Sequence, residues 1–134
     1  MTGTPAISVS GPAVPETLRV FRNVAASEGA RDDISFDRLE ELRVAVDEAA
    51  TLVLLAEGAR TLTLDLRSDD GGLQVSVRSD GTAEDWPGDR HRSWGGKVIA
   101  ALASDVRMTV DDGCPEVGFS WLASEGARVD RRDG

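Results

Sequence analysis

The period of the hydrophobic pattern changes once along this chain of 134 residues, and that change limits the folds it can adopt. Before Gly58, apolar residues recur every three or four positions, as in amphipathic helices. After it, "TLTLDLRS" and "LQVSVRS" alternate apolar and polar residues, which predicts half-buried strands. The residues between these two runs, Asp69, Asp70, Gly71 and Gly72, are typical of a hairpin turn. We therefore expect helices combined with an antiparallel sheet.

The N-terminal half predicts one short strand and two helices. These are a strand at residues 6–10 that Gly11 and Pro12 end, a helix at 15–29 and a helix at 36–56. Ser35 is the expected N-cap of the second helix, and Gly58 is its natural C-terminal stop. The apolar stripe of that helix is expected to comprise Phe36, Leu39, Leu42, Val46, Ala49 and Val53.

The C-terminal half predicts one more helix and two more strands. They follow a long loop at 80–93 and comprise a helix at 94–103 and strands at 105–110 and 116–122. This order of elements predicts an α+β fold, a two-layer sandwich whose mostly antiparallel sheet is covered on one face by helices. We expect a single domain over 1–134, with a core at about 6–122 and a polar tail at 123–134.

Composition excludes several classes of function. The single cysteine, Cys114, and the single histidine, His91, cannot form a disulfide or the usual four-ligand zinc site. A net charge of −9 argues against direct nucleic-acid binding and suits a basic protein partner. The longest apolar run, 52–56, is too short to span a bilayer, and the N-terminus lacks a secretory signal pattern. We therefore expect a cytoplasmic protein without a structural metal.

Charged residues gather in two places. The loop and the helix after it carry the only basic island, Arg90, His91, Arg92 and Lys97, which suits either a solvated mobile loop or an anion or partner site. Helix 36–56 carries a charged set that predicts a solvated face: Asp37, Arg38, Glu40, Glu41, Arg43 and Asp47. Within that set, the spacing of Arg43 and Asp47 predicts an ion pair.

The stretch "RLEELRVAVDEAATLVLLA" at 38–56 resembles the N-box helix of RsbW-type anti-sigma factors, the small serine-protein kinases of the GHKL (Bergerat) ATPase superfamily. The likeness extends over about residues 6–122. It implies that Glu48 stands at the catalytic base of the family and Leu52 at the asparagine that ligates Mg²⁺. Leucine cannot coordinate a metal that requires oxygen ligands, so Glu48 is interpreted as a relic base.

Two further segments resemble the remaining nucleotide-binding boxes of the family. In "VSVRSDGT", Ser79 stands where the family has an adenine-binding aspartate before the turn glycine Gly81, and Asp80 is one residue away as a substitute. In "SWGGKV", Gly95 and Gly96 match the phosphate cradle, although Ser93 replaces its first glycine. The family cofactors are ATP and Mg²⁺, and these departures predict that no cofactor is bound.

The resemblance implies a degenerate, actinobacterial-type anti-sigma factor of the stress or sporulation group. Its partners would be an alternative sigma factor and a STAS-domain anti-anti-sigma factor, and the formation of a homodimer stays open. The candidate partner-binding residues are Arg19, Arg22, Arg90 and Arg92. Two alternatives stay open: an active serine-protein kinase that uses Thr51 as a substitute Mg²⁺ ligand, and a sensor that binds another ligand in the vacated pocket.

Overall fold

The computed structural model describes residues 7–31 and 33–123, which form five strands and three α-helices. The strands are β1 (Ile7–Pro12), β2 (Thr61–Ser68), β3 (Gly72–Ser79), β4 (Ser104–Asp111) and β5 (Cys114–Leu122). The α-helices are α1 (Pro15–Gly29), α2 (Phe36–Leu54) and α3 (Trp94–Leu102), and a short 3₁₀ helix, η1, covers Arg90–Arg92. The predicted order of elements is confirmed. The predicted tail lies outside the described residues, apart from Ala123.

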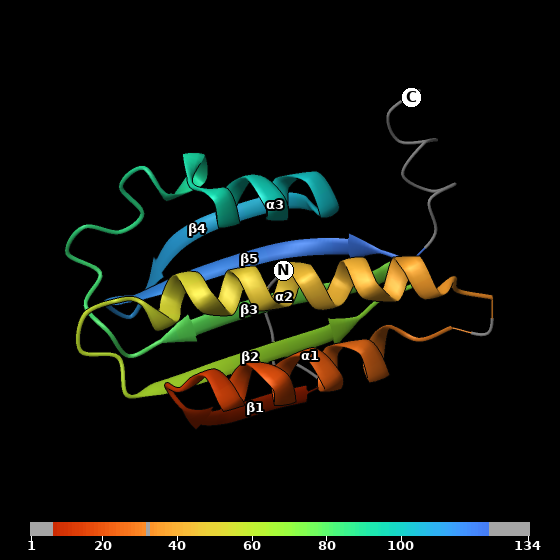
Figure 1. Ribbon diagram of the computed structural model, residues 1–134, viewed down its shortest axis with the longest axis horizontal. Helices are drawn as coiled ribbons and strands as arrows, with labels where there is room; N and C mark the ends of the chain where they lie inside the picture. The colour runs from red at the N-terminus through yellow and green to blue at the C-terminus, as the bar shows by residue number, and fades with distance from the viewer. Residues whose placement is uncertain (1–6, 32, 124–134) are drawn as a thin grey trace.

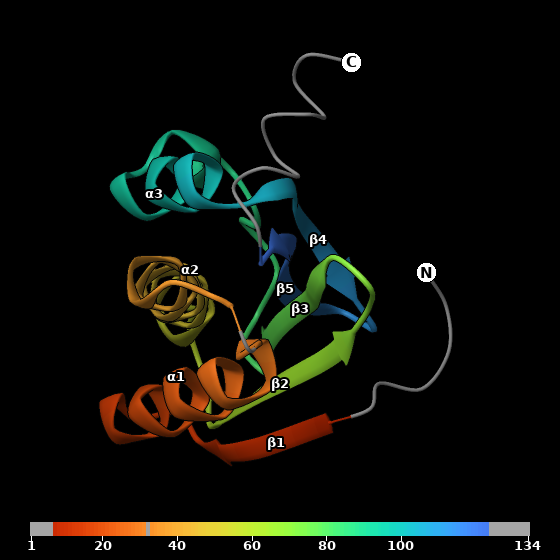
Figure 2. The same ribbon diagram turned by 90° about the vertical axis from the view of Figure 1, so that its right-hand side faces the viewer.

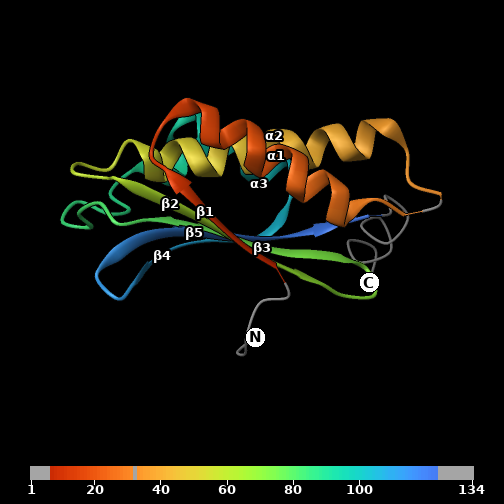
Figure 3. The ribbon, with the colours of Figure 1, turned by 90° about the horizontal axis from the view of Figure 1, so that it is seen from below.

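The strands form one sheet in the order β1-β2-β3-β5-β4, and every neighbouring pair is antiparallel. The three helices lie side by side on one face of this sheet, with α2 in the middle (Figures 1 and 2). In Figure 3 the three α-helices all lie on the same side of the sheet, and within residues 7–31 and 33–123 the opposite face carries no helix. The predicted α+β fold, a two-layer sandwich with an antiparallel sheet, is therefore confirmed.

The period-two alternation decides which side chains face the helices. Leu62, Leu64 and Leu66 of β2 are buried, and the residues between them are half-buried or exposed on the other face. Two aromatic residues of this core, Phe119 and Trp121, lie on β5 and are fully buried. Burying this apolar surface supplies the main driving force for packing helices and sheet together.

The ends of several elements differ from the prediction. β1 continues through Gly11 to Pro12, which pairs with Thr61. Proline is tolerated there because β1 is an edge strand, which pairs on one side only. Helix α2 ends at Leu54, two residues early, and Gly58 follows with a φ of 79°, as expected of a glycine after a helix.

The first turn of α2 contains the largest error of the sequence interpretation. The predicted cap is confirmed, because Ser35 Oγ accepts the N–H of Arg38 at 3.1 Å. Phe36, however, does not join the apolar stripe and is 74% exposed. Arg38, predicted on the solvated face, is instead only 2% exposed. Its guanidinium stacks over Trp121 at 5.1 Å and donates from Nε to the Leu122 carbonyl at 3.0 Å.

No helix within residues 7–31 and 33–123 is both long and apolar enough to cross a membrane. The longest helix, α2, contains seven charged residues among its nineteen: Asp37, Arg38, Glu40, Glu41, Arg43, Asp47 and Glu48.

Candidate functional site

The N-box residues of α2 meet the glycine pair of α3. A Cβ atom added to Gly95 would lie 3.0 Å from Glu48 Oε1 and 3.6 Å from Leu52 Cδ2. Glycine therefore lets the start of α3 approach α2 closely at these two side chains. Two segments about 45 residues apart in sequence thus place Glu48, Leu52 and Gly95 in one cluster, as the resemblance implies.

Leu52 contributes only carbon atoms to this cluster. Its side chain is 9% exposed and belongs to the hydrophobic core. The neighbouring hydroxyl of Thr51, the one suggested substitute for a metal ligand, donates to the Asp47 carbonyl of its own helix at 2.8 Å. Both positions are therefore committed to packing or to hydrogen bonding within α2.

Glu48 is half-buried, and its environment favours the neutral acid. Burial is the main cause that raises the pKa of its carboxyl above the ordinary value, and the negative charge of Asp47 raises it further. A carboxyl with a raised pKa is suited to accept and return a proton. This property is what a relic base would retain.

The turn after β3 contains the second set of predicted site residues. Ser79 is 3% exposed, and its Oγ accepts the N–H of Gly81 at 3.2 Å. Gly81 packs against α2, because an added Cβ would lie 2.7 Å from Ala56 Cβ. Ser79 therefore shapes the turn that leads into the loop, and Gly81 is required by close packing.

Asp80, the suggested substitute for the adenine-binding aspartate, has hydrogen-bond partners within the fold. Its Oδ1 accepts the backbone N–H groups of Arg60 at 2.7 Å and Thr61 at 2.9 Å. These two hydrogen bonds lower the pKa of Asp80 and hold its carboxylate at the start of β2. Asp80 is thus engaged by the neighbouring strand, and its role as a substitute for the adenine-binding aspartate stays a prediction.

The start of α3 is capped from within the chain. Ser93 Oγ accepts the N–H of Gly96 at 3.1 Å and donates to the Arg90 carbonyl at 2.5 Å. A Cβ on Gly96 would lie 2.2 Å from that same carbonyl oxygen, so only glycine fits. In a phosphate cradle the backbone N–H groups at a helix start point at the anion. Here a serine hydroxyl already accepts one of them.

Loop 80–93 is folded rather than free of contacts. Trp86 is only 8% exposed and belongs to the core cluster, and Arg90 stacks over its ring at 5.1 Å. Arg90 Nη1 also donates to the carbonyls of Asp85 at 2.9 Å and Pro87 at 3.1 Å. Of the basic island, Arg90 is therefore engaged within the loop, while His91, Arg92 and Lys97 are exposed.

The predicted partner-binding arginines of α1 have different environments. Arg19 is exposed, whereas Arg22 forms an ion pair with Asp47 of α2. The predicted pair of Arg43 and Asp47 is wrong, because Arg22 reaches Asp47 from the neighbouring helix. Arg43 instead lies 3.3 Å from Glu40 and donates to Asn23 Oδ1 of α1 at 2.9 Å. These contacts fasten α1 to α2.

The sequence interpretation missed a hollow of about 710 Å³ on the sheet face without helices. It is lined by the polar positions of the same alternating strands, among them Asp65, Gln74 and Arg78. The alternation itself was the available signal, because it places every second residue on one face. It did not show that the rows from four strands come together around a depression.

The fold and the cluster around Glu48 define the class of protein. The sequence matches the histidine kinase-like ATPase domain over residues 11–121, which includes all of the elements that build the cluster. The chain belongs to this family of ATPase domains.

Two known proteins place it more narrowly. They are the anti-sigma-F factors RsbW of Mycobacterium tuberculosis from strains CDC 1551 / Oshkosh and ATCC 25618 / H37Rv. Each is 31% identical over 121 residues, which cover 88% of this chain and 70% of the relative. The predicted membership of the RsbW-like anti-sigma factor family is therefore confirmed.

Proposed function

We propose that this protein is an anti-sigma factor that binds an alternative sigma factor of the stress or sporulation group and keeps it from RNA polymerase in the cytoplasm. The observation that carries the proposal is the 31% identity to anti-sigma-F factor RsbW over 88% of the chain. The net charge of −9 supports it, because an acidic protein is attracted to the basic DNA-binding surface of a sigma factor.

Binding by this protein does not depend on phosphoryl transfer. Mg²⁺ takes oxygen ligands in octahedral geometry, and Leu52 offers only carbon at the position of the family ligand. The internal cap by Ser93 and the commitment of Asp80 to β2 support the same proposal. The residues present therefore do not fit Mg-ATP. Because this protein then does not phosphorylate a STAS-domain partner, that partner releases the sigma factor by competing for the same surface of this protein.

The contacts also narrow the candidate partner surface. Arg22 and Arg90 are engaged inside the fold, by Asp47 and by the loop carbonyls respectively. Arg19 and Arg92 are exposed, and they are the two of the four candidates that we propose as partner-binding residues. We propose that these two arginines contact acidic side chains of the partner, so charge reversal at either position places like charges together and acts mainly on the association rate, whereas the general attraction to the basic surface comes from the acidic remainder of the protein.

A binding experiment tests the sigma-factor proposal. The tagged full chain is used to isolate partners from an extract of its own cells, and the recovered sigma factor is then purified for affinity measurements. Arg19→Glu and Arg92→Glu should weaken binding, whereas Arg60→Glu, at another exposed arginine, is the charge-matched control. Recovery of specific partners without any sigma factor would contradict the proposal.

A serine-protein kinase is the second candidate, because the raised pKa of Glu48 is a property of a catalytic base. Calorimetry with Mg-ATP and transfer of labelled phosphate to a purified STAS-domain protein separate the two. We expect no saturable heat and no transfer above the background of a Glu48→Gln variant. Transfer by the native chain that this variant loses would establish the kinase instead.

A further inference from the structure

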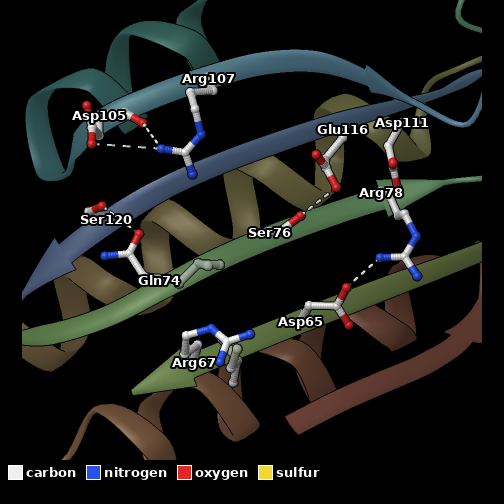
Figure 4. Close-up of a pocket in the computed structure, with 12 residues that line it drawn as sticks. Asp65, Arg67, Gln74, Ser76, Arg78, Asp105, Arg107, Asp111, Glu116 and Ser120 are labelled. Atoms are coloured by element: carbon white, nitrogen blue, oxygen red, sulfur yellow. Dashed lines mark hydrogen bonds and ion pairs between the residues drawn. The ribbon is translucent and has the colours of Figure 1, made fainter. Parts of the chain in front are cut away.

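The sheet face opposite the helices is polar across all of its central strands. The hollow on this face is lined by Asp65, Leu66, Arg67, Gln74, Val75, Ser76, Arg78, Asp105, Arg107, Asp111, Glu116 and Ser120. Figure 4 shows most of these side chains around the depression, on four different strands. None of the residues of the candidate ATP site contributes to it, so the hollow is a separate feature of the molecule.

Arg107 is aimed across this hollow by an irregular backbone. The pairing of β4 with β5 shifts its register between Ser104 and Arg107, and Asp105 has a φ of 56°. A bulge of this kind redirects the side chain that follows it, and a non-glycine residue at positive φ is often found at functional sites. The Asp105 carbonyl then accepts a hydrogen bond from Arg107 Nη1 at 3.0 Å.

Gly118 provides the floor on which the guanidinium of Arg107 lies. A Cβ on Gly118 would lie 2.9 Å from Arg107 Nη2 and 3.4 Å from its Nε. The side chain of Arg107 remains 49% exposed, and its nearest carboxylate, on Asp105, is 3.9 Å away and itself 75% exposed. The guanidinium is therefore fixed in place while much of its surface faces the hollow.

The two ends of the hollow differ in charge. At one end, Arg107 and Arg67 reach in from strands on either side of Gln74 (Figure 4). At the other end, Asp111 and Glu116 contribute carboxylates (Figure 4). Each end also holds one opposite charge, Asp105 beside Arg107 and Arg78 beside Asp65, so a ligand that spans the hollow would meet an excess of arginine donors at one end and of carboxylate acceptors at the other.

The acidic end is also arranged for hydrogen bonding. Glu116 Oε2 accepts the hydroxyl of Ser76 at 2.8 Å, and its Oε1 accepts the hydroxyl of Thr109 at 3.2 Å. Asp65 is held by Arg78 at 2.5 Å. Carboxylates fixed in this way can accept hydrogen bonds from the hydroxyl groups of a ligand, and their negative charge repels an anionic group of that ligand.

We propose that this hollow binds a small phosphorylated polyhydroxy compound, such as a sugar phosphate. The phosphate lies against Arg107, because a guanidinium presents paired N–H donors to phosphate oxygens. The hydroxyl groups lie toward Glu116 and Asp111. The volume of about 710 Å³ falls within the usual range for small-molecule sites. This site shares no residue with the candidate ATP site or with the proposed partner-binding residues Arg19 and Arg92.

Calorimetry on the full chain tests the proposal with three probes: glucose 6-phosphate, ribose 5-phosphate and glycerol 3-phosphate. At least one should bind saturably at one site per chain, and more tightly than its unphosphorylated counterpart. Arg107→Ala should weaken that binding about tenfold or more, because it removes charge-assisted hydrogen bonds to the phosphate. Arg60→Ala, at an exposed arginine outside the hollow, should leave binding unchanged.

A second variant and a localisation experiment distinguish a loss of ligand binding from a loss of folding. Gly118→Ala keeps every charge but places a methyl group under the Arg107 guanidinium, so it should also weaken binding. Amide chemical-shift changes on titration should gather on β3, β4 and β5. The proposal is overturned if none of the three probes binds, if Arg107→Ala binds as tightly as Arg60→Ala, or if the shifts gather at Gly95 and Gly96 instead.

Discussion

Two tryptophans of this protein are each stacked under an arginine at 5.1 Å, and the two pairs have different consequences for the fold. Arg38 and Trp121 join the start of α2 to the end of β5, and the arginine is 2% exposed. Arg90 and Trp86 both belong to the loop before α3, and Arg90 is half-buried. The same stacking therefore connects two layers of the sandwich in one case and closes a loop on itself in the other.

The difference lies in the span of the hydrogen bonds. Arg38 donates to the carbonyl of Leu122, which is 84 residues away, whereas Arg90 donates to carbonyls three and five residues away. Breaking the first pair separates α2 from β5, and breaking the second rearranges one loop. Regions held by local contacts open at lower free-energy cost than the core does. We therefore expect the loop to open at a lower free-energy cost than the contact between α2 and β5.

Arg38→Ala should produce the largest effect. It removes a buried guanidinium, leaves the Leu122 carbonyl without its donors and breaks the ion pair with Glu41. Loss of one member of a buried charged network costs about 3–5 kcal/mol of unfolding free energy. Urea denaturation measures it, with Arg43→Ala in the same helix as the control, because Arg43 is half exposed and should lose less than about 1 kcal/mol. Equal losses in both variants would contradict the contrast.

Arg38 also shows why part of the fold could not be predicted from the sequence. The period of the hydrophobic pattern predicted every strand and α-helix that the structure describes, because this period is set by residues that are close together in the sequence. The role of Arg38 depends on Trp121 and Leu122, which pack against it only after the sheet has formed. By local spacing alone, Arg38 belonged with the charged face of its helix.

Leu52→Asn should have the next largest effect, because it restores the family residue at the other end of α2. The amide would enter a core position that is 9% exposed, where an unsatisfied polar group costs about 1–3 kcal/mol. We expect a loss in that range and no Mg-ATP binding, since Ser93 still caps Gly96. Leu55→Asn at an exposed position controls for the substitution itself. Saturable Mg-ATP heat with Leu52→Asn would show that residue 52 alone had closed the site.

The candidate site was predictable only as far as its residues resemble a family. The resemblance placed Glu48, Leu52 and Gly95 at matching positions, and the structure brings these three together. It could not show that Asp80 would cap β2 or that Trp86 would enter the core. Both outcomes depend on which partner lies nearest in space, and a motif does not specify that.

Arg90→Ala should cost only about 1 kcal/mol, because the hydrogen bonds it removes join neighbours within one loop. The informative measurement is hydrogen exchange along the chain, which reports local opening. Exchange should accelerate within residues 82–93 and stay unchanged in α2 and β5. Acceleration throughout the core would mean that the second Arg–Trp pair supports the whole fold, which would remove the difference between the two pairs.

Glu48→Gln should have the smallest effect on the free energy of unfolding, and the dependence of that effect on pH tests whether Glu48 acts through its ionisation. Burial and Asp47 raise the pKa of Glu48, so the folded protein keeps this proton to a higher pH than the unfolded chain does. Stability is therefore lost as the pH rises from about 4.5 through the folded pKa. Glutamine does not ionise, so the variant avoids this loss.

Glu48→Gln and the native chain should thus be equally stable near pH 3, as far as this charge is concerned, and the variant should be more stable at pH 7 by less than about 1 kcal/mol. Urea denaturation across that range measures the difference, with Glu57→Gln at an exposed position as the control for loss of one charge. A difference that is constant with pH would mean that residue 48 acts through its packing against Gly95 and not through its ionisation. In that case Glu48 would act as Arg38 does at the other end of α2, as a packing contact, and it would not behave as a catalytic base.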